Sequence, residues 1–296
     1  MKQINRCAAL AALFGTLMTA PLAQAQQIDA RPLTPRDVHD YGLPDGTQLS
    51  GGLLVVGLGE AVYLEAHVDV GLTVSGVTWS IEERPLGGST AQLQPSPLPI
   101  DMPIFSPGDR VIYQVAGRQM FMPDIEGKYQ VKAIVNTSDG TVEITTQVTG
   151  ARYVGVGTLG GASPDYPQCA LCHEEQALGW MGTGHADYFT RAIDGEISSH
   201  YGESCTDCHT LGLNRTGDNG NFWSVAAELG WTFPETLEAG NWEALPMELK
   251  AMSNVQCEHC HGPGSIHHGD STTTAVSLSA GDCGQCHDED PYYYQT

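Results

Sequence analysis

Four copies of the pentapeptide Cys-x-x-Cys-His lie between residues 169 and 287 of this 296-residue chain. The paired cysteines are Cys169 and Cys172, Cys205 and Cys208, Cys257 and Cys260, and Cys283 and Cys286, and the histidines that follow them are His173, His209, His261 and His287. In this pattern two thiols form thioethers with one haem, and the histidine binds its iron. The sequence therefore predicts four covalently attached haem c groups, with these histidines as proximal ligands.

Structural zinc and disulfides are the alternatives for paired cysteines. Zinc sites use Cys-x-x-Cys pairs but require no histidine directly after the second cysteine, and here all four pairs have one. The ninth cysteine, Cys7, lies in the N-terminal leader, so no thiol outside the four motifs remains for a disulfide in the mature chain. Haem attachment is the interpretation that uses all four motifs.

Residues 1–25 have the pattern of a secretory signal peptide. Lys2 and Arg6 precede an apolar run from Ala8 to Ala20, and Ala23-Gln24-Ala25 is a small-residue cleavage site. The apolar run is too short to span a membrane, and no other transmembrane segment is evident. We expect an exported product that begins near Gln26 and resides in the periplasm or at the cell surface.

The mature chain is strongly acidic. Without the leader it has 11 basic and 35 acidic residues, a net charge of −24. This charge disfavours binding to nucleic acid or anionic membranes. It would attract basic redox partners, and it would serve solubility equally well.

Residues 49–155 show the alternation of apolar and polar residues that is typical of half-buried strands. Val62, Leu64, Ala66 and Val68 fall on one face, and His67 lies on the other, where we expect it to be a surface residue. The pattern returns around Trp79, from Tyr129 to Val135, and from Val142 to Val148. It predicts an antiparallel β-sandwich, preceded by an N-terminal arm, 26–48, without periodicity.

The sandwich segment resembles a bacterial immunoglobulin-like domain. The resemblance rests on Trp79 in an early strand and on Pro123-Asp124-Ile125-Glu126-Gly127-Lys128-Tyr129, which is similar to the tyrosine corner of such folds. Val131 stands where an antibody domain has its second cysteine, so no inter-sheet disulfide is expected. The resemblance implies a docking or assembly module, and a simple spacer is the alternative.

A Gly- and Ser-rich linker, 156–167, leads into residues 168–296. There the strand pattern ends, and short helices are expected at 174–181, 184–193, 222–229 and 242–252, with irregular loops between them. Such loops suit a chain that wraps cofactors and needs little core of its own. The predicted fold is therefore multidomain, an all-β sandwich followed by a mostly α and irregular multihaem domain.

Histidines outside the motifs are the candidate sixth ligands of the irons. The candidates are His185, His200, His267 and His268, with His259 and His39 as weaker ones. Their number fits bis-His ligation throughout, which predicts low reduction potentials because an axial Met is missing. His185 in Trp180-Met181-Gly182-Thr183-Gly184-His185, and His267 or His268 after Cys-His-Gly-Pro-Gly, lie in stretches that resemble multihaem cytochromes c, where such histidines are distal ligands.

Residues 165–290 resemble, in particular, tetrahaem electron-transfer cytochromes, including those that accept electrons from hydroxylamine-oxidising enzymes. This resemblance implies an electron carrier, and not an enzyme, that relays electrons between other redox proteins. The sequence leaves two alternatives. One is a multihaem enzyme whose open iron acts on a small nitrogen or sulfur species. The other is a subunit of an extracellular cytochrome filament, in which His39 or the sandwich bridges copies by self-assembly.

Overall fold

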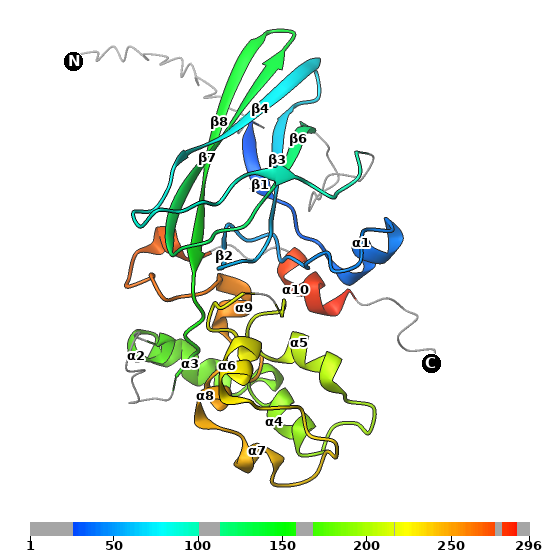
Figure 1. Cartoon of the computed structure of the whole chain (residues 1–296), viewed down its shortest axis with the longest axis vertical. Coiled ribbons are helices and arrows are strands. Elements are labelled where there is room, and N and C mark those ends of the chain that lie inside the picture. Colours follow the sequence, from blue (N-terminus) through cyan, green and yellow to red (C-terminus); the bar gives the residue numbers. More distant parts are fainter. Residues whose placement is uncertain (1–25, 101–112, 158–167, 216, 276–279, 289–296) are drawn as a thin grey trace, which may run out of the picture.

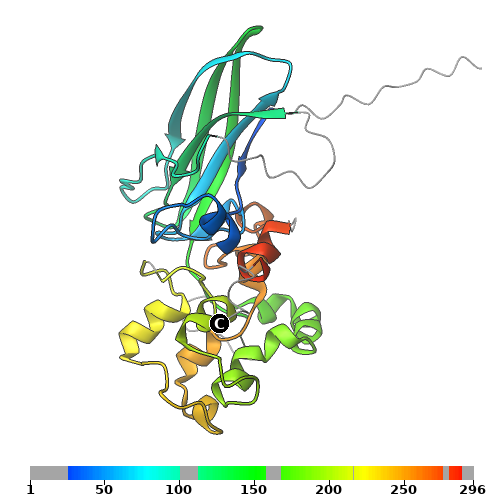
Figure 2. The ribbon, with the colours of Figure 1, turned by 90° about the vertical axis from the view of Figure 1, so that its right-hand side faces the viewer.

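The computed structural model describes residues 26–100, 113–157, 168–215, 217–275 and 280–288. The predicted signal peptide, 1–25, lies outside the described residues, and so does most of the predicted linker. A β-sandwich occupies one end of the molecule and a region of short helices the other (Figures 1 and 2). We refer to residues 26–157 as the sandwich region and to residues 168–288 as the helical region.

The sandwich region contains two four-stranded sheets. One sheet has the strand order β1 (Gln27–Ala30), β3 (Val62–Asp69), β6 (Tyr113–Phe121) and β5 (Gln94–Pro95). The other has the order β2 (Val55–Gly57), β8 (Gly140–Ala151), β7 (Gly127–Thr137) and β4 (Val74–Glu83). All pairings are antiparallel except that of β2 with β8, which is parallel. The two sheets confirm the predicted sandwich.

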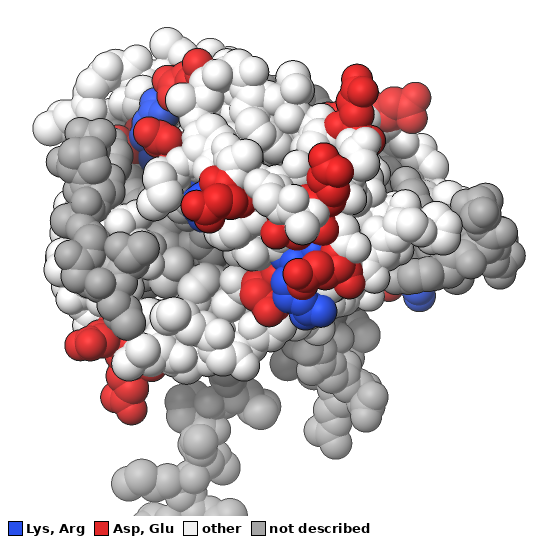
Figure 3. Space-filling view, turned by 90° about the horizontal axis from the view of Figure 1, so that it is seen from below, with Lys and Arg blue, Asp and Glu red and all other residues white. Residues whose placement is uncertain are grey.

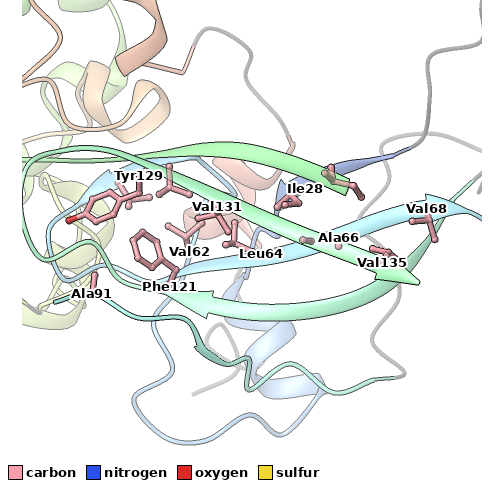
Figure 4. Packing of buried hydrophobic residues seen from close by; sticks show 14 residues of the cluster. Ile28, Val62, Leu64, Ala66, Val68, Ala91, Phe121, Tyr129, Val131 and Val135 are labelled. Atoms are coloured by element: carbon pink, nitrogen blue, oxygen red, sulfur yellow. The ribbon is translucent and has the colours of Figure 1, made fainter. Parts of the chain in front are cut away.

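Alternating apolar residues of both sheets meet in one core, shown in Figure 4. Val62, Leu64, Ala66 and Val68 of β3 are fully buried there, as the period-two pattern predicts. Phe121 and Tyr129 pack edge to face across the core, with ring centroids 4.9 Å apart. This core is the main source of stability that the sandwich region has without any cofactor.

The second face of β3 is also buried, which corrects the expectation for His67. Its side chain is 3 % exposed and stacks on Tyr113, with ring centroids 4.6 Å apart. The ring lies between the Asp29 and Glu65 carboxylates, at 3.0 Å and 3.3 Å. A charged partner on either side makes this burial tolerable, and alternation along one strand cannot reveal those partners.

The segment 26–48, expected to be an arm, is ordered against the sandwich. β1 pairs with β3 along four residues, and α1 (Pro35–Asp40) follows with a capping box between Thr34 and Asp37. Leu33 is fully buried beside Tyr63 and Leu98, so this segment covers the outer face of β3. A single four-residue strand is too short to produce a convincing period-two signal.

The helical region is built from short elements joined by loops. Its α-helices are α2 (Cys169–Cys172), α3 (Glu174–Met181), α4 (Tyr188–Ile193), α5 (Thr206–His209), α6 (Phe222–Leu229), α7 (Asn241–Ala244), α8 (Met247–Ala251), α9 (Cys257–His261) and α10 (Ala280–His287). Three 3₁₀ turns, η1 (Gly184–Ala186), η2 (Glu203–Cys205) and η3 (Ser271–Thr273), complete it. The expected helices 174–181 and 222–229 coincide with α3 and α6, whereas 184–193 and 242–252 are each divided in two.

The two regions are joined by polar contacts. Thr34 donates to Asp288 at 2.9 Å and Arg36 pairs with the same carboxylate at 3.1 Å, so α1 lies beside α10, as Figure 1 shows. Lys128 at the start of β7 pairs with Asp270 at 2.7 Å. The fourth motif, on α10, is therefore held against the N-terminal segment, which bears directly on the site described next.

Candidate functional site

Each Cys-x-x-Cys-His motif forms a short helix in the described structure. The motifs coincide with α2, with η2 and α5, with α9 and with the end of α10. A helical turn places residues i, i+3 and i+4 on one side, which brings both cysteines and the histidine of the last three motifs to one side of the backbone. His173 directly follows α2 as its C-cap, with φ of −115°. None of the eight cysteines of the motifs forms a disulfide in the described part of the chain. All eight thiols are therefore available for covalent attachment.

The first and third motifs lie side by side. The thiols of Cys169 and Cys257 interact with each other, and this contact raises the pKa of Cys169 and lowers that of Cys257 to about 7. Both motifs are also anchored to the segment that leaves β8. The Cys169 Sγ atom lies 3.6 Å from the Gly155 carbonyl oxygen, and Val154 binds the side chain of Glu258.

The second and fourth motifs form another pair. The Cys286 Sγ atom lies 4.0 Å from the carbonyl oxygen of Cys208. Burial, together with the nearby His287 and His185, lowers the pKa of His209 to about 4. The third and fourth motifs also meet, since Gln285 donates to the His259 carbonyl oxygen at 3.3 Å. The first motif thus lies beside the third, and the fourth beside both the second and the third, an order that their spacing along the chain does not predict.

Two of the motif histidines lie close to a second histidine ring. His173 and His267 have ring centroids 6.3 Å apart with an interplanar angle of 20°, and His185 and His287 have centroids 6.2 Å apart at 34°. An iron between two imidazoles would separate the ring centres by about 6 Å, because each metal–nitrogen bond is about 2 Å long and each ring centre lies about 1 Å beyond the nitrogen. Both pairs fit an axial ligand set.

Backbone carbonyls orient two of the imidazoles. The His261 Nδ1 atom lies 2.6 Å from the Ala275 carbonyl oxygen, and the His267 Nδ1 atom lies 3.1 Å from that of Asp270. If each Nδ1–H donates to its carbonyl, the Nε2 atom is left unprotonated for a metal. His267 thus combines a neighbouring histidine ring with a carbonyl oxygen beside its Nδ1 atom. His268, the other candidate after the third motif, has a positive φ of 37°, which is uncommon for residues other than glycine.

His209 has a different environment from the paired histidines. Tyr188 lies against its ring with centroids 4.2 Å apart, and the Tyr201 ring lies at 5.5 Å. The Tyr201 hydroxyl is 3.3 Å from the His209 Nδ1 atom. Among the described residues, neither His209 nor His261 makes a ring contact with another histidine. No sequence pattern singles out these two tyrosines.

Among the described residues, His259 and His200 make no ring contact with another histidine. His259 is buried, its Nδ1 accepts from the Gln256 N–H at 3.0 Å, and its Nε2 lies 2.9 Å from the Thr210 carbonyl oxygen. Both ring nitrogens are thus used, and burial lowers the pKa of this imidazole to about 4. His200 is exposed, and His39 lies on the exposed end of α1, 3.0 Å from Asp40.

Two fully buried carboxylates lie at the junction of the two regions, and the sequence analysis missed both. Burial raises the pKa of Glu258 to about 7, and backbone N–H groups of Gly155, Gly264 and Val154 oppose this shift. Burial also raises the pKa of Glu60, which accepts from Gly57 and Tyr153. An acidic residue inside a haem motif looks like a surface residue in the sequence, so only the fold reveals its burial.

No group of three or more His, Cys, Asp or Glu side chains in the described ranges is arranged to hold a metal ion by itself. None of the helices in the same ranges is long and apolar enough to cross a membrane.

Part of the chain is similar to a known family. A family model described as "Cytochrome c554 and c-prime" matches residues 168–226, which contain the first two motifs, His185 and His200. The match supports a c-type cytochrome with covalently bound haem c and a haem-based electron-transfer role. A search of curated proteins finds no match.

Proposed function

We propose that the chain is an exported tetrahaem c-type cytochrome that passes electrons between redox partners. The observation that carries this proposal is the pair of facing histidines on two of the four motifs, His173 with His267 and His185 with His287. The eight motif cysteines would hold the haems, which supply one-electron redox chemistry when bound. The chain's own residues set the ligands, the burial and the spacing.

In this proposal His173, His209, His261 and His287 are the proximal ligands. His267 and His185 are the distal ligands of the first and fourth haems. His200 and His268 remain candidates for the other two. Bis-His ligation lacks the axial Met that raises potentials, so low potentials follow.

The side-by-side placement of the motifs supports a relay. Cys169 with Cys257, and Cys286 with Cys208, bring the attachment points together in two pairs. Within each pair the porphyrins would be close neighbours, which favours rapid electron exchange. Partners of this chain are then other redox proteins, and the acidic surface favours basic ones.

Mass spectrometry and electron paramagnetic resonance of the purified ferric protein test this function. The expected result is a mass increase of four haems and low-spin signals from at least the first and fourth irons. A product that matures with fewer than four haems, in a host able to attach haem c, contradicts the tetrahaem proposal. Replacing His267 by Met should alter one low-spin signal and leave that of the fourth iron unchanged, because His185 and His287 remain in place.

A second function is favoured by the surroundings of His209. Tyrosine rings, and no second histidine ring, contact this imidazole in the described part of the chain. An iron held there would keep an exchangeable position, and a small nitrogen or sulfur species could react at it. A high-spin signal from about one haem in four that shifts on adding nitric oxide supports this enzyme. Purely low-spin spectra rule it out in favour of the carrier.

The sandwich region is proposed to be immunoglobulin-like. Its strand order, the parallel pairing of β2 with β8, and Tyr129 support this assignment. The Tyr129 hydroxyl lies 3.0 Å from the Ile125 carbonyl oxygen, a contact typical of a tyrosine corner. An experimental structure that lacks this corner would contradict the assignment.

A further inference from the structure

The chain that leaves β8 does not act as a free linker. In Figure 1 it runs from the sandwich region down towards α9 and α3. Along residues 154–156 its N–H groups donate to side chains of the third motif's segment. Val154 and Gly155 donate to Glu258, and Val156 donates to the Gln256 Oε1 atom at 2.5 Å.

Glu258 is the centre of this contact. It lies between Cys257 and His259 and is 3 % exposed. Its Oε1 atom accepts from Val154 at 3.0 Å and from Gly264 at 2.7 Å, and its Oε2 atom accepts from Gly155 at 2.7 Å. Hydrogen bonds from N–H groups to a carboxylate are strong. Here they join residues 154 and 155, which follow β8, to the third motif and to Gly264 after it.

The first motif is attached to the same three residues. The Ala170 N–H donates to the Val156 carbonyl oxygen at 2.9 Å, and Gln168 donates to that of Val154 at 2.9 Å. Gly155 has φ of +76°, and a Cβ atom there would lie 2.5 Å from the Ala251 carbonyl oxygen. The backbone of residues 154–156 is therefore confined to one conformation. The first motif is hydrogen-bonded to it through Gln168 and Ala170, and the third motif through Glu258.

We propose that Glu258 is a positioning residue that fixes the spacing of the first and third haems by binding residues 154–155. This inference rests on the proposed function, because it requires haems at both motifs. Glu258 touches neither iron and acts through the backbone that carries Cys169. In this proposal the sandwich region supports the first and third haems, because the segment that follows its last strand is bound to both motifs.

Glu258→Gln is the decisive variant. The amide keeps the size of the side chain but presents an NH₂ group to backbone N–H donors, so it cannot satisfy all three. The measurement is circular dichroism in the Soret band of the full-length haem protein, where closely spaced haems give a two-lobed signal. We expect Glu258→Gln to lose most of the lobes due to the first and third haems while keeping four haems by mass.

Glu60→Gln is the matched control. Glu60 is also buried at the junction, but it binds Gly57, Tyr153 and Asn219, and among the described residues it has no hydrogen bond to the first or third motif. It should lower stability and leave the Soret signal at the wild-type amplitude. Glu258→Asp keeps the charge with a shorter reach, so it should mature even if the Gln variant does not and should give an intermediate signal.

The outcomes separate the two proposals. A wild-type protein with fewer than four haems contradicts the proposed function. A wild-type protein with four haems and a two-lobed signal that either Glu258 variant retains in full overturns the positioning role. Equal loss of the signal in Glu60→Gln also overturns it, because a general loosening of the junction would then be sufficient.

Discussion

The sandwich region and the helical region reach order by different routes. In the first, strands of up to twelve residues pair along most of their length, with register shifts only between β3 and β6 and between β4 and β7 among the described pairings, and they enclose a continuous apolar core. In the second, no α-helix of the described residues exceeds eight residues. Helices this short are marginal by themselves. We infer that the sandwich region is stabilised by its own continuous core. The helical region has a separate apolar cluster around Phe189 and Phe222, and we expect its attached groups to supply much of the remaining packing.

The two regions also differ in net charge. Residues 26–167 contain 8 basic and 16 acidic residues, whereas residues 168–296 contain 3 and 19. Figure 3, seen from the helical end, accordingly shows many acidic side chains and few basic ones. In the helical region, Arg215 pairs with Glu203 at 2.7 Å and with Asp207 at 2.8 Å. The excess negative charge opposes compaction of the helical region, and attached haems would have to overcome it.

Removing one attachment site should affect the helical region most. Cys257→Ser combined with Cys260→Ser should lose the third haem and, with it, much of the packing around α9. Native-state hydrogen exchange would show lost protection from residue 168 onward, while β3 and β7 keep theirs. Equal loss of protection in β3 and β7 would contradict the comparison, because the sandwich region would then depend on haem as well.

A cavity in the sandwich core should have the converse effect. Leu64 is fully buried, so Leu64→Ala should reduce the free energy of unfolding of this region by about 2–5 kcal/mol. Denaturation followed by far-ultraviolet circular dichroism measures the loss, and haem absorption should be unchanged in the folded protein. Val70→Ala is the control, because Val70 is 54 % exposed and should change stability little.

The Tyr129 hydroxyl should contribute a smaller amount. It lies 3.0 Å from the Ile125 carbonyl oxygen and 2.9 Å from Asp124. Tyr129→Phe keeps the ring against Phe121 but removes these contacts, so it should cost about 1–2 kcal/mol. The same denaturation assay measures it. A neutral result would show that the loop 123–126 is held by other bonds, such as that of Thr90 to Asp124.

Much of this architecture could be predicted from the sequence because its signals are local. A Cys-x-x-Cys-His motif lies within five residues, and the alternation from Tyr129 to Val135 lies within one strand. The pairing of first motif with third could not be predicted, because it depends on residues 154–156 meeting Glu258 across about a hundred positions. The burial of His67 could not be predicted for the same reason, because its partners Asp29 and Tyr113 come from β1 and β6.

The smallest expected effect is a pH dependence confined to the sandwich region. Burial alone would lower the pKa of His67, but the Asp29 and Glu65 carboxylates raise it above its ordinary value of 6.5. A histidine with a raised pKa binds its proton more tightly when folded. Its contribution to stability is complete below pH 6.5 and is lost as the pH rises through the raised pKa.

Denaturation of the full-length protein at several pH values above 6.5 measures this effect, with His67→Gln as the comparison. The wild-type sandwich should lose stability towards alkaline pH, and the variant should show a flatter profile. Arg118 also faces Glu65, at 2.7 Å, and keeps its charge over this range, so the difference between the two profiles isolates His67. Parallel profiles would contradict this prediction. They would mean that no ion pair between His67 of β3 and Asp29 of β1 contributes to stability.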